Sequence, residues 1–170
     1  VWWAQGHQEE AGTVWKKILE ENPDHYMAKT GLIRYEMEKG RLTEAKELMM
    51  EQMERSSHDE TILELLKTAN DILIPQYQKK LEEAVTRDRQ WKEDAIELGW
   101  CLFQNEQQQE ACTLMQSFEP EEDQKYGYVN LLGRICYQLE RYEEARPYLE
   151  QWVHMIRNTV DDGSAENQKR

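Results

Sequence analysis

The sequence is poor in glycine, proline and long apolar runs. It has 8 glycines and 4 prolines in 170 residues. No apolar run approaches the roughly 20 residues that would span a bilayer. A basic segment followed by an apolar core, the pattern of a secretory signal peptide, is also absent. Strict alternation of β-branched and polar residues is nearly missing, which argues against strands. These absences favour a helical protein that is soluble in water.

Basic residues are in the minority. The chain has 34 acidic and 21 basic residues, for a formal net charge of −13. Proteins that bind nucleic acids usually present a basic surface, so a polyanionic partner is disfavoured. An acidic surface instead tolerates basic or apolar partners. We therefore expect a protein or peptide partner, basic or amphipathic, with no nucleic acid and no membrane insertion.

Cysteine is scarce, and its arrangement argues against disulfides and zinc. The three cysteines are an odd number without CxxC spacing, and their neighbours "GWCLF", "EACTL" and "RICYQ" have the character of helix interiors. Buried free thiols in a reducing compartment explain them better than a disulfide or a metal site does. We accordingly expect a cytoplasmic protein.

Catalytic and cofactor motifs are missing as well. There is no G-x-S-x-G, P-loop or dinucleotide fingerprint. Carboxylate pairs such as Glu143/Glu144 are adjacent in sequence, and neighbours on a helix point about 100° apart, so they cannot converge on one substrate. The four histidines stand far apart and lack the spacing of a helical metal site. We expect no enzyme, no metal and no cofactor.

Helical periodicity dominates what remains. Segments such as "DETILELLKTANDIL" and "YVNLLGRICYQL" carry apolar residues three and four positions apart. The pattern predicts helices of about 12 to 15 residues joined by short polar turns, and hence an all-α fold.

Four blocks repeat along the chain. "HQEEAGTVWKKI" and "RLTEAKELMMEQ" place their alanines, Ala11 and Ala45, 34 residues apart. "QQQEACTLMQSF" and "RYEEARPYLEQW" place Ala111 and Ala145 at the same spacing. Glutamate followed by alanine therefore recurs as a packing motif, with a small residue where helices cross. A divergent repeat fits the gap between the two pairs. In it, Tyr77, Leu81 and Ala84 take the places of Ala111, Met115 and Phe118, and Pro75 is expected at the start of a second helix.

A leucine-glycine pair also recurs. Leu98-Gly99 and Leu132-Gly133 lie 34 residues apart, each inside a predicted helix. Glycine in a helix costs about 1 kcal/mol relative to alanine. The pairs therefore predict that another helix approaches too closely there for a side chain.

With its period of 34 residues and two helices in each unit, the sequence resembles the tetratricopeptide repeat (TPR) family. The last unit matches the motif through Leu132, Gly133, Tyr142, Ala145 and Leu149, and the one before it through Leu98, Gly99, Ala111, Met115 and Phe118. The first full unit keeps Leu32, Gly40, Leu42, Ala45 and Met49 but has Ile33 where glycine is expected. The N-terminal fragment keeps Trp2, Gly6, Ala11, Trp15 and Pro23.

The resemblance implies a right-handed superhelix (solenoid) of antiparallel helix-turn-helix units. We expect a half-repeat at 1–24, then units near 26–57, 58–91, 92–125 and 126–159. Residues 160–170 are expected to be a polar tail or a linker to a further unit, in a chain that is part of something longer. Trp15, Trp152 and Trp2 are assigned to packing, and Trp3 and Trp91 to partly exposed positions.

In TPR proteins the residue after the mid-helix glycine faces a concave groove, which makes Trp100 a candidate binding residue. The same resemblance places further positions on that surface. The predicted groove residues are Arg34, Met37, Ile96, Trp100, Phe103, Asn130, Arg134 and Tyr137. Acidic Glu93 and Glu97 lie beside them.

The resemblance implies a non-catalytic scaffold that holds a peptide, helix or partner domain in this groove. Two alternatives stay open: a sensor in which a groove ligand controls an attached domain, and a self-association module. The acidic tails of Hsp70 and Hsp90 are disfavoured, because the positions of that clamp hold Thr30, Arg34, Leu63, Glu93 and Glu97.

Overall fold

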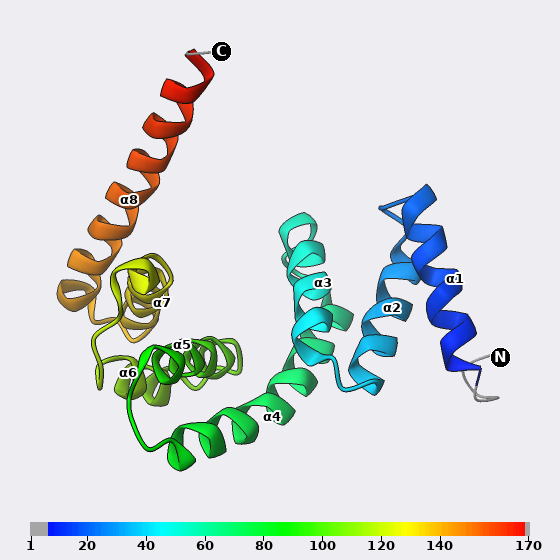
Figure 1. Ribbon diagram of the computed structural model, residues 1–170, viewed down its shortest axis with the longest axis horizontal. Coiled ribbons are helices and arrows are strands. Elements are labelled where there is room, and N and C mark those ends of the chain that lie inside the picture. Colours follow the sequence, from blue (N-terminus) through cyan, green and yellow to red (C-terminus); the bar gives the residue numbers. More distant parts are fainter. Residues whose placement is uncertain (1–6, 169–170) are drawn as a thin grey trace. The chain divides into compact units, whose positions relative to one another are not determined.

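The structure, a computed structural model, consists of helices joined by turns and short irregular segments, with no strand among the residues that it describes, 7–168 (Figure 1). Side chains are described over residues 7–160, so the predictions for Trp2, Trp3 and Gly6 lie outside the described residues. The helices are α1 (Gln8–Glu21), α2 (Tyr26–Glu38), α3 (Leu42–Arg55), α4 (Glu60–Glu83), α5 (Arg89–Gln104), α6 (Gln108–Met115), the 3₁₀ helix η1 (Glu122–Gln124), α7 (Lys125–Gln138) and α8 (Tyr142–Gln168). The predicted all-α class is confirmed.

The chain divides into two compact units, residues 1–72 and 73–170. In the first, α2 packs against both α1 and α3. Its core includes Ile33, Met49 and Ile62, none of which has exposed surface. Turns of a few residues join successive helices, so neighbours run antiparallel, as expected of helical hairpins.

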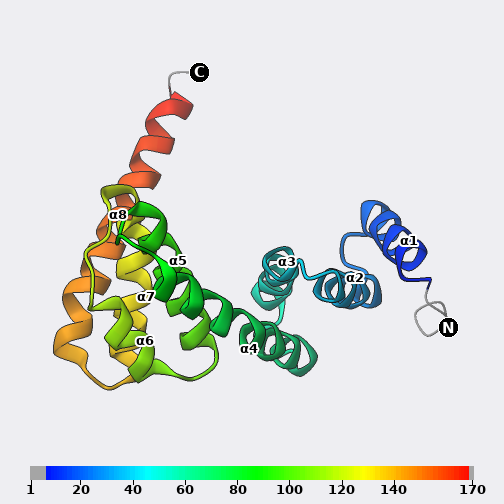
Figure 2. The same ribbon diagram turned by 60° about the horizontal axis from the view of Figure 1, so that its bottom comes forward.

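The second unit contains two helix pairs, α5 with α6 and α7 with α8 (Figure 2). Helix α7 packs against α8 and also against α5 and α6, so it links the two pairs. Leu131, Leu132 and Ile135 of α7 are fully buried, together with Met115 of α6. Burying one such side chain stabilises the fold by roughly 1.5–3 kcal/mol, which makes this helix the centre of the unit.

The recurring alanines are packing residues. Ala45, Ala111 and Ala145 are at most 1% exposed, and Ala11 is also buried. The mid-helix glycines behave as predicted too. A Cβ on Gly99 would lie 2.8 Å from Sδ of Met115, and one on Gly133 would lie 2.7 Å from Cδ2 of Leu149. Close helix contact therefore explains both features.

Three helices end in the same turn. At the ends of α2, α5 and α7, the residues in left-handed conformation are Gly40 (φ 75°), Glu106 (φ 61°) and Glu140 (φ 59°). Each donates its N–H to a carbonyl three residues back, and the next residue donates to one five residues back, with N···O distances of 2.8–3.1 Å. This pair of bonds is the Schellman motif. It recurs 34 residues apart at Glu106 and Glu140, so the repeat extends to backbone conformation.

Helix α4 differs from the prediction for its repeat. A second helix beginning at Pro75 was expected, but α4 runs without a break from Glu60 to Glu83 with Pro75 inside it. Ala84, expected in a helix contact, lies past the helix end and is exposed. The segment "LLKTANDILIPQY" has no glycine and keeps helical apolar spacing, so proline alone did not end the helix.

Trp91 also departs from its prediction. It was assigned to a partly exposed position but is 7% exposed. Its ring packs edge-on against Phe118 with centroids 5.4 Å apart, and its Nε1 donates to the Leu81 carbonyl at 3.3 Å. The contact joins the end of α4 to α5 within the second unit, a role that the position of Trp91 before the repeat motif did not reveal.

Candidate partner-binding site

The predicted groove residues of the second unit come from one face of α5 and one face of α7. Helix α5 supplies Ile96, Trp100 and Phe103, at spacings of four and three residues. Helix α7 supplies Asn130, Arg134 and Tyr137 at the same spacings. Residues three or four apart lie on the same side of a helix, so each set forms a stripe.

Two of these aromatics, with an arginine, surround a small hollow. Phe103, Arg134 and Tyr137 line a cavity of about 310 Å³ together with Gln138 and Leu149. Trp100 lies next to Phe103, with the rings edge-on and their centroids 6.0 Å apart. The structure therefore brings most of the predicted residues of this unit to one place.

Arg134 is held by contacts on both sides. Its Nε donates to Oδ1 of Asn130 at 2.8 Å, one turn earlier on α7. Its guanidinium carbon also lies 5.6 Å from the ring centroid of Trp152 on α8, a cation–π distance. A preorganised, exposed guanidinium loses less rotamer entropy when a partner binds.

Ile96 differs from its neighbours because it is 9% exposed and belongs to the core of the unit. Arg34 and Met37 lie on α2 in the first unit, where Arg34 is exposed and Met37 is half-buried. They occupy the positions of Trp100 and Phe103 in their own repeat. Their part in a binding surface stays a prediction.

Tyr142 is a residue of this region that the sequence did not single out as a binding residue. It is 54% exposed and stacks edge-on with Tyr137, with centroids 5.3 Å apart. The repeat motif has a tyrosine with a packing role at this position, so the sequence did not predict that Tyr142 is exposed. Leu149 was likewise matched to the motif, yet it is only half-buried and lines the hollow.

Polar contacts position α7 beside α5. Arg89, at the start of α5, forms two bonds to the carboxylate of Asp123, at 2.8 and 2.5 Å. The Arg89 guanidinium holds the pKa of Asp123 below its usual value. Gln124 Nε2 donates to the Arg89 carbonyl at 3.2 Å. Together these contacts hold the start of α7 against the start of α5.

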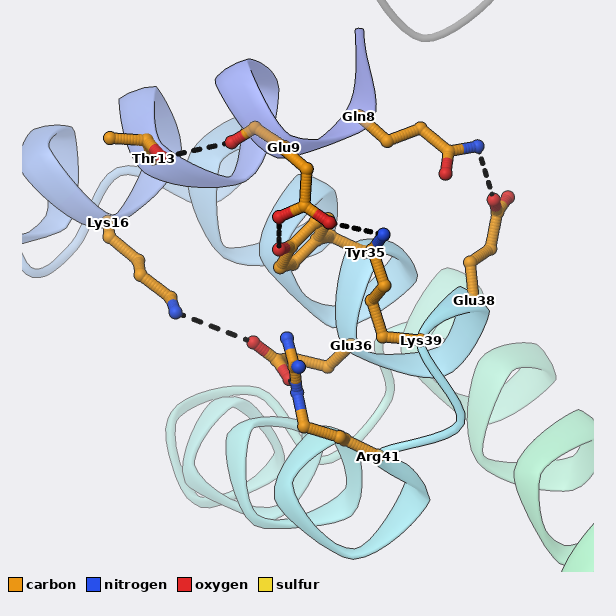
Figure 3. A network of polar contacts seen from close by, with 9 residues as sticks. All are labelled: Gln8, Glu9, Thr13, Lys16, Tyr35, Glu36, Glu38, Lys39 and Arg41. Carbon is orange, nitrogen blue, oxygen red and sulfur yellow. Dashed lines mark hydrogen bonds and ion pairs between the residues drawn. The ribbon is translucent and has the colours of Figure 1, made fainter. Parts of the chain in front are cut away.

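A second polar cluster lies in the first unit, around Tyr35 (Figure 3). Tyr35 Oη donates to a Glu9 carboxylate oxygen at 2.6 Å, and Lys39 pairs with the same carboxylate. Lys39 is the main reason that the pKa of Glu9 is lowered, and the Tyr35 hydroxyl adds to it. The cluster therefore ties α1 to α2.

Glu36 is the buried carboxylate of that cluster. It is 5% exposed and pairs with Arg41 before α3 and, at 3.8 Å, with Lys16 on α1 (Figure 3). A buried charge is stable only when it is paired, and here two cations compensate it. Its contacts are internal to the unit, so we assign it to holding three helices together.

The three cysteines are free and buried, as predicted. Burial raises the pKa of the Cys136 thiol to about 11, and the neighbouring Cys112 adds to the shift. A protonated, enclosed thiol is a poor nucleophile. Among the described residues no three His, Cys, Asp or Glu side chains gather as metal ligands do. None of the described helices has the length and apolar character needed to cross a membrane.

Comparison with known proteins gives one family match. The family model of subunit 3 of the anaphase-promoting complex, or cyclosome, matches residues 80–152. That family consists of TPR-type repeats, and the matched range covers the paired helices with the 34-residue equivalences described above. Residues 80–152 therefore match a family of tetratricopeptide repeats.

Two further results complete the comparison. A crystal structure of MamA aligns with 94% of this chain and 95% of that chain, at 15% identity and a TM-score of 0.44. No curated protein matches the sequence. The TPR assignment therefore rests on the family match and on the repeats.

Proposed function

We propose that this TPR chain is a non-catalytic scaffold that holds a partner protein on the face formed by Trp100, Phe103, Asn130, Arg134 and Tyr137. The observation that carries the proposal is the hollow of about 310 Å³ where Phe103, Arg134 and Tyr137 meet. Tyr137 is 59% exposed and Arg134 is exposed, so both are available to a partner.

The composition of this face supports binding. Tryptophan, tyrosine and arginine are the residues most enriched among interface hot spots, where truncation costs 2 kcal/mol or more. The hollow is small, so it suits one or two anchoring side chains of a peptide or helix. Exposed Glu97 lies on α5 one turn before Trp100, and exposed Glu93 lies two turns before it, which suits basic residues flanking the anchor.

The family match supports a role within a multi-protein assembly. The matched model is named for a subunit of a multi-protein complex, and TPR arrays are typically scaffolds. We therefore propose that the partner is a protein of a larger assembly and that the chain positions it without chemistry of its own.

A pull-down with matched variants tests the proposal. The chain and its Trp100→Ala, Arg134→Ala double variant are used to capture proteins from a lysate of the source, and mass spectrometry identifies them. A partner retained by the wild type and lost, by at least tenfold, from the double variant supports the proposal.

A second double variant serves as the control. Val14 and Lys17 are an exposed apolar residue and an exposed cation on α1, so Val14→Ala, Lys17→Ala removes similar chemistry elsewhere. This control variant must still capture the partner, and circular dichroism must show equal helicity in all three proteins. Equal capture by the wild type and the groove variant would contradict the proposal.

A further inference from the structure

The second unit contains a leucine-lined hollow between the end of α4 and the paired helices α5 and α6. Its volume is about 430 Å³, within the range of roughly 300–1,000 Å³ that is typical of ligand pockets. Leu98 and Leu102 of α5 line it, and each is 3% exposed. Leu81 of α4 and Leu114 of α6 line it as well, and both are half-buried. Three helices therefore present apolar side chains to one space.

Two exposed carboxylates line the same hollow, Glu82 from α4 and Glu110 from α6. Glu110 accepts a long bond from Gln107 Nε2, at 3.5 Å. Neither carboxylate forms an ion pair with a side chain that the structure describes. The negative charge on the leucine-lined hollow is therefore uncompensated within the described residues.

The cations near these carboxylates are engaged elsewhere. Lys79, one turn before Glu82 on α4, pairs with Glu83 at 3.8 Å. Arg141 donates to Oε1 of Gln109, another lining residue, at 2.9 Å, and makes no ion pair with Glu110. A cation that neutralises this site would have to come from another molecule.

The end of α4 is related to α5 as α6 is related to α7. The Leu81 carbonyl accepts a bond from Trp91 Nε1 at 3.3 Å, and the Met115 carbonyl accepts one from Tyr128 Oη at 2.6 Å. Leu81 and Met115 are 34 residues apart in the sequence. The leucine-lined hollow can therefore be compared with the equivalent place in the next repeat.

A larger side chain occupies that equivalent place. Leu114 corresponds to Tyr148 of α8, which is half-buried. Burial raises the pKa of the Tyr148 hydroxyl, and the nearby thiol of Cys136 on α7 adds to the shift. The ring of Tyr148 therefore takes up space that the shorter Leu114 leaves free.

The polar residues at the edge of the hollow differ between the repeats as well. Glu82 and Glu110 correspond to Gln116 and Glu144. Gln116 Nε2 donates to Oε2 of Glu144 at 3.4 Å, which connects α6 to α8. Two ionised carboxylates cannot form such a bond, because neither has a proton to donate. Like charges and a shorter side chain therefore leave the space between α4 and α6 open.

We infer that the leucine-lined hollow binds an arginine side chain of a partner protein. The aliphatic stem would lie on Leu81 and Leu114, and the guanidinium would lie between Glu82 and Glu110. Arginine suits both parts of the site, because its stem is apolar and its weakly hydrated, planar head carries five N–H donors. Trp100 is not among the lining residues, so this site is separate from the face in the proposed function.

Two helical peptides test the inference with the full chain. Both carry a leucine one turn before and one turn after a central residue, which is arginine in one peptide and citrulline, its uncharged isostere, in the other. Fluorescence anisotropy is expected to show about tenfold tighter binding of the arginine peptide, because its hydrogen bonds to carboxylates are charge-assisted. This preference should shrink as salt is added.

Three variants locate the binding in the leucine-lined hollow. Leu114→Tyr introduces the residue of the next repeat and should abolish binding of the arginine peptide. Glu82→Gln and Glu110→Gln each remove one carboxylate, and each should reduce the preference for arginine over citrulline by about threefold. Both glutamates are exposed, so these two replacements should leave the helicity measured by circular dichroism unchanged.

Glu144→Gln is the matched control, because it removes the same charge from the position equivalent to Glu110 in the next repeat. It should bind the arginine peptide as the wild type does. Trp100→Ala should also bind it normally, which separates this site from the proposed face.

Three results with the peptides would overturn the inference: equal binding of both, binding of neither, and binding of the arginine peptide that Leu114→Tyr leaves intact. A dimer in sedimentation velocity that Leu114→Tyr dissolves would also overturn it, because the hollow would then be occupied by a second copy of this chain.

Discussion

Single residues in the turns show how closely the repeats agree. Gly40, Glu106 and Glu140 share one left-handed conformation and one pair of backbone bonds. Glycine adopts this conformation freely, whereas a residue with a Cβ pays roughly 1–2 kcal/mol. The glutamates are held there by the helices on either side, so two of the three turns carry strain.

Replacing a strained glutamate should therefore stabilise the chain. We expect Glu106→Gly to raise the free energy of unfolding by about 0.5–1 kcal/mol, because relief of strain outweighs the added entropy of the unfolded chain. Gly40→Ala should lower it by about 1 kcal/mol. Urea unfolding followed by circular dichroism measures both.

The control is Glu110→Gly, an exposed glutamate inside α6. Glycine in a helix interior costs about 1 kcal/mol, so this variant should be destabilised. If Glu106→Gly lowered the free energy of unfolding as much as Glu110→Gly does, the assignment of a strained left-handed conformation to Glu106 would be contradicted.

Cys136 makes stability depend on alkaline pH. Burial, and then the nearby Cys112, raise the pKa of the folded thiol from 9.0 to about 11. The unfolded chain thus releases this proton at lower pH than the folded one, so the stabilisation is complete below pH 9 and is lost as pH rises toward 11. The free energy of unfolding should fall more steeply across this window in the wild type than in Cys136→Ala. Parallel pH profiles would contradict the assignment.

Small residues were the most predictable part of the sequence, and special backbone conformations the least. The 34-residue spacing of Ala111 and Ala145 predicted buried helix crossings, and the Leu-Gly pairs predicted close contact. Glu106 gave no such signal, because glutamate is not a left-handed residue by preference. The sequence did not predict that Tyr142 is exposed, because the repeat motif gives the tyrosine at that position a packing role.

Helix α4 is the element whose course the repeat pattern predicted wrongly. Its segment is two residues short of two full periods, and proline at the start of a helix offered a simple way to fit it. The structure instead keeps Pro75 inside one helix of 24 residues. Proline lacks the N–H that an interior position would donate, so this helix forms despite the loss of a bond.

A substitution distinguishes the two arrangements. Pro75 is exposed, and in a continuous helix Pro75→Ala should raise the free energy of unfolding by about 1–2 kcal/mol, since it restores a backbone bond. If a second helix began at Pro75, alanine would lose a favoured first-turn residue, and stability would fall. Gln76→Ala, at an exposed neighbour, should change stability by less than about 0.5 kcal/mol. Urea unfolding of the three proteins decides between them.

For the whole molecule, the sequence predicted the repeat type and the fold class but not the course of every helix. The repeat phase over residues 92–159 led to both the TPR assignment and the face around Trp100 and Arg134. The length of α8 could not be predicted, because the residues after Thr159 contain Gly163 and polar side chains that suggested a linker. Continuation of α8 depends on helix propagation from Tyr142, which a local pattern does not show.

The most direct test of the central claim is site-specific photo-crosslinking at the proposed face. A photoreactive phenylalanine analogue replaces Phe103 or Tyr137, and in a control it replaces exposed Tyr26 on α2. The account predicts that positions 103 and 137 crosslink the same protein, that position 26 does not, and that Arg134→Ala removes the product. Crosslinking of that protein at position 26 alone, or at all three positions alike, would contradict a partner-binding face on α5 and α7.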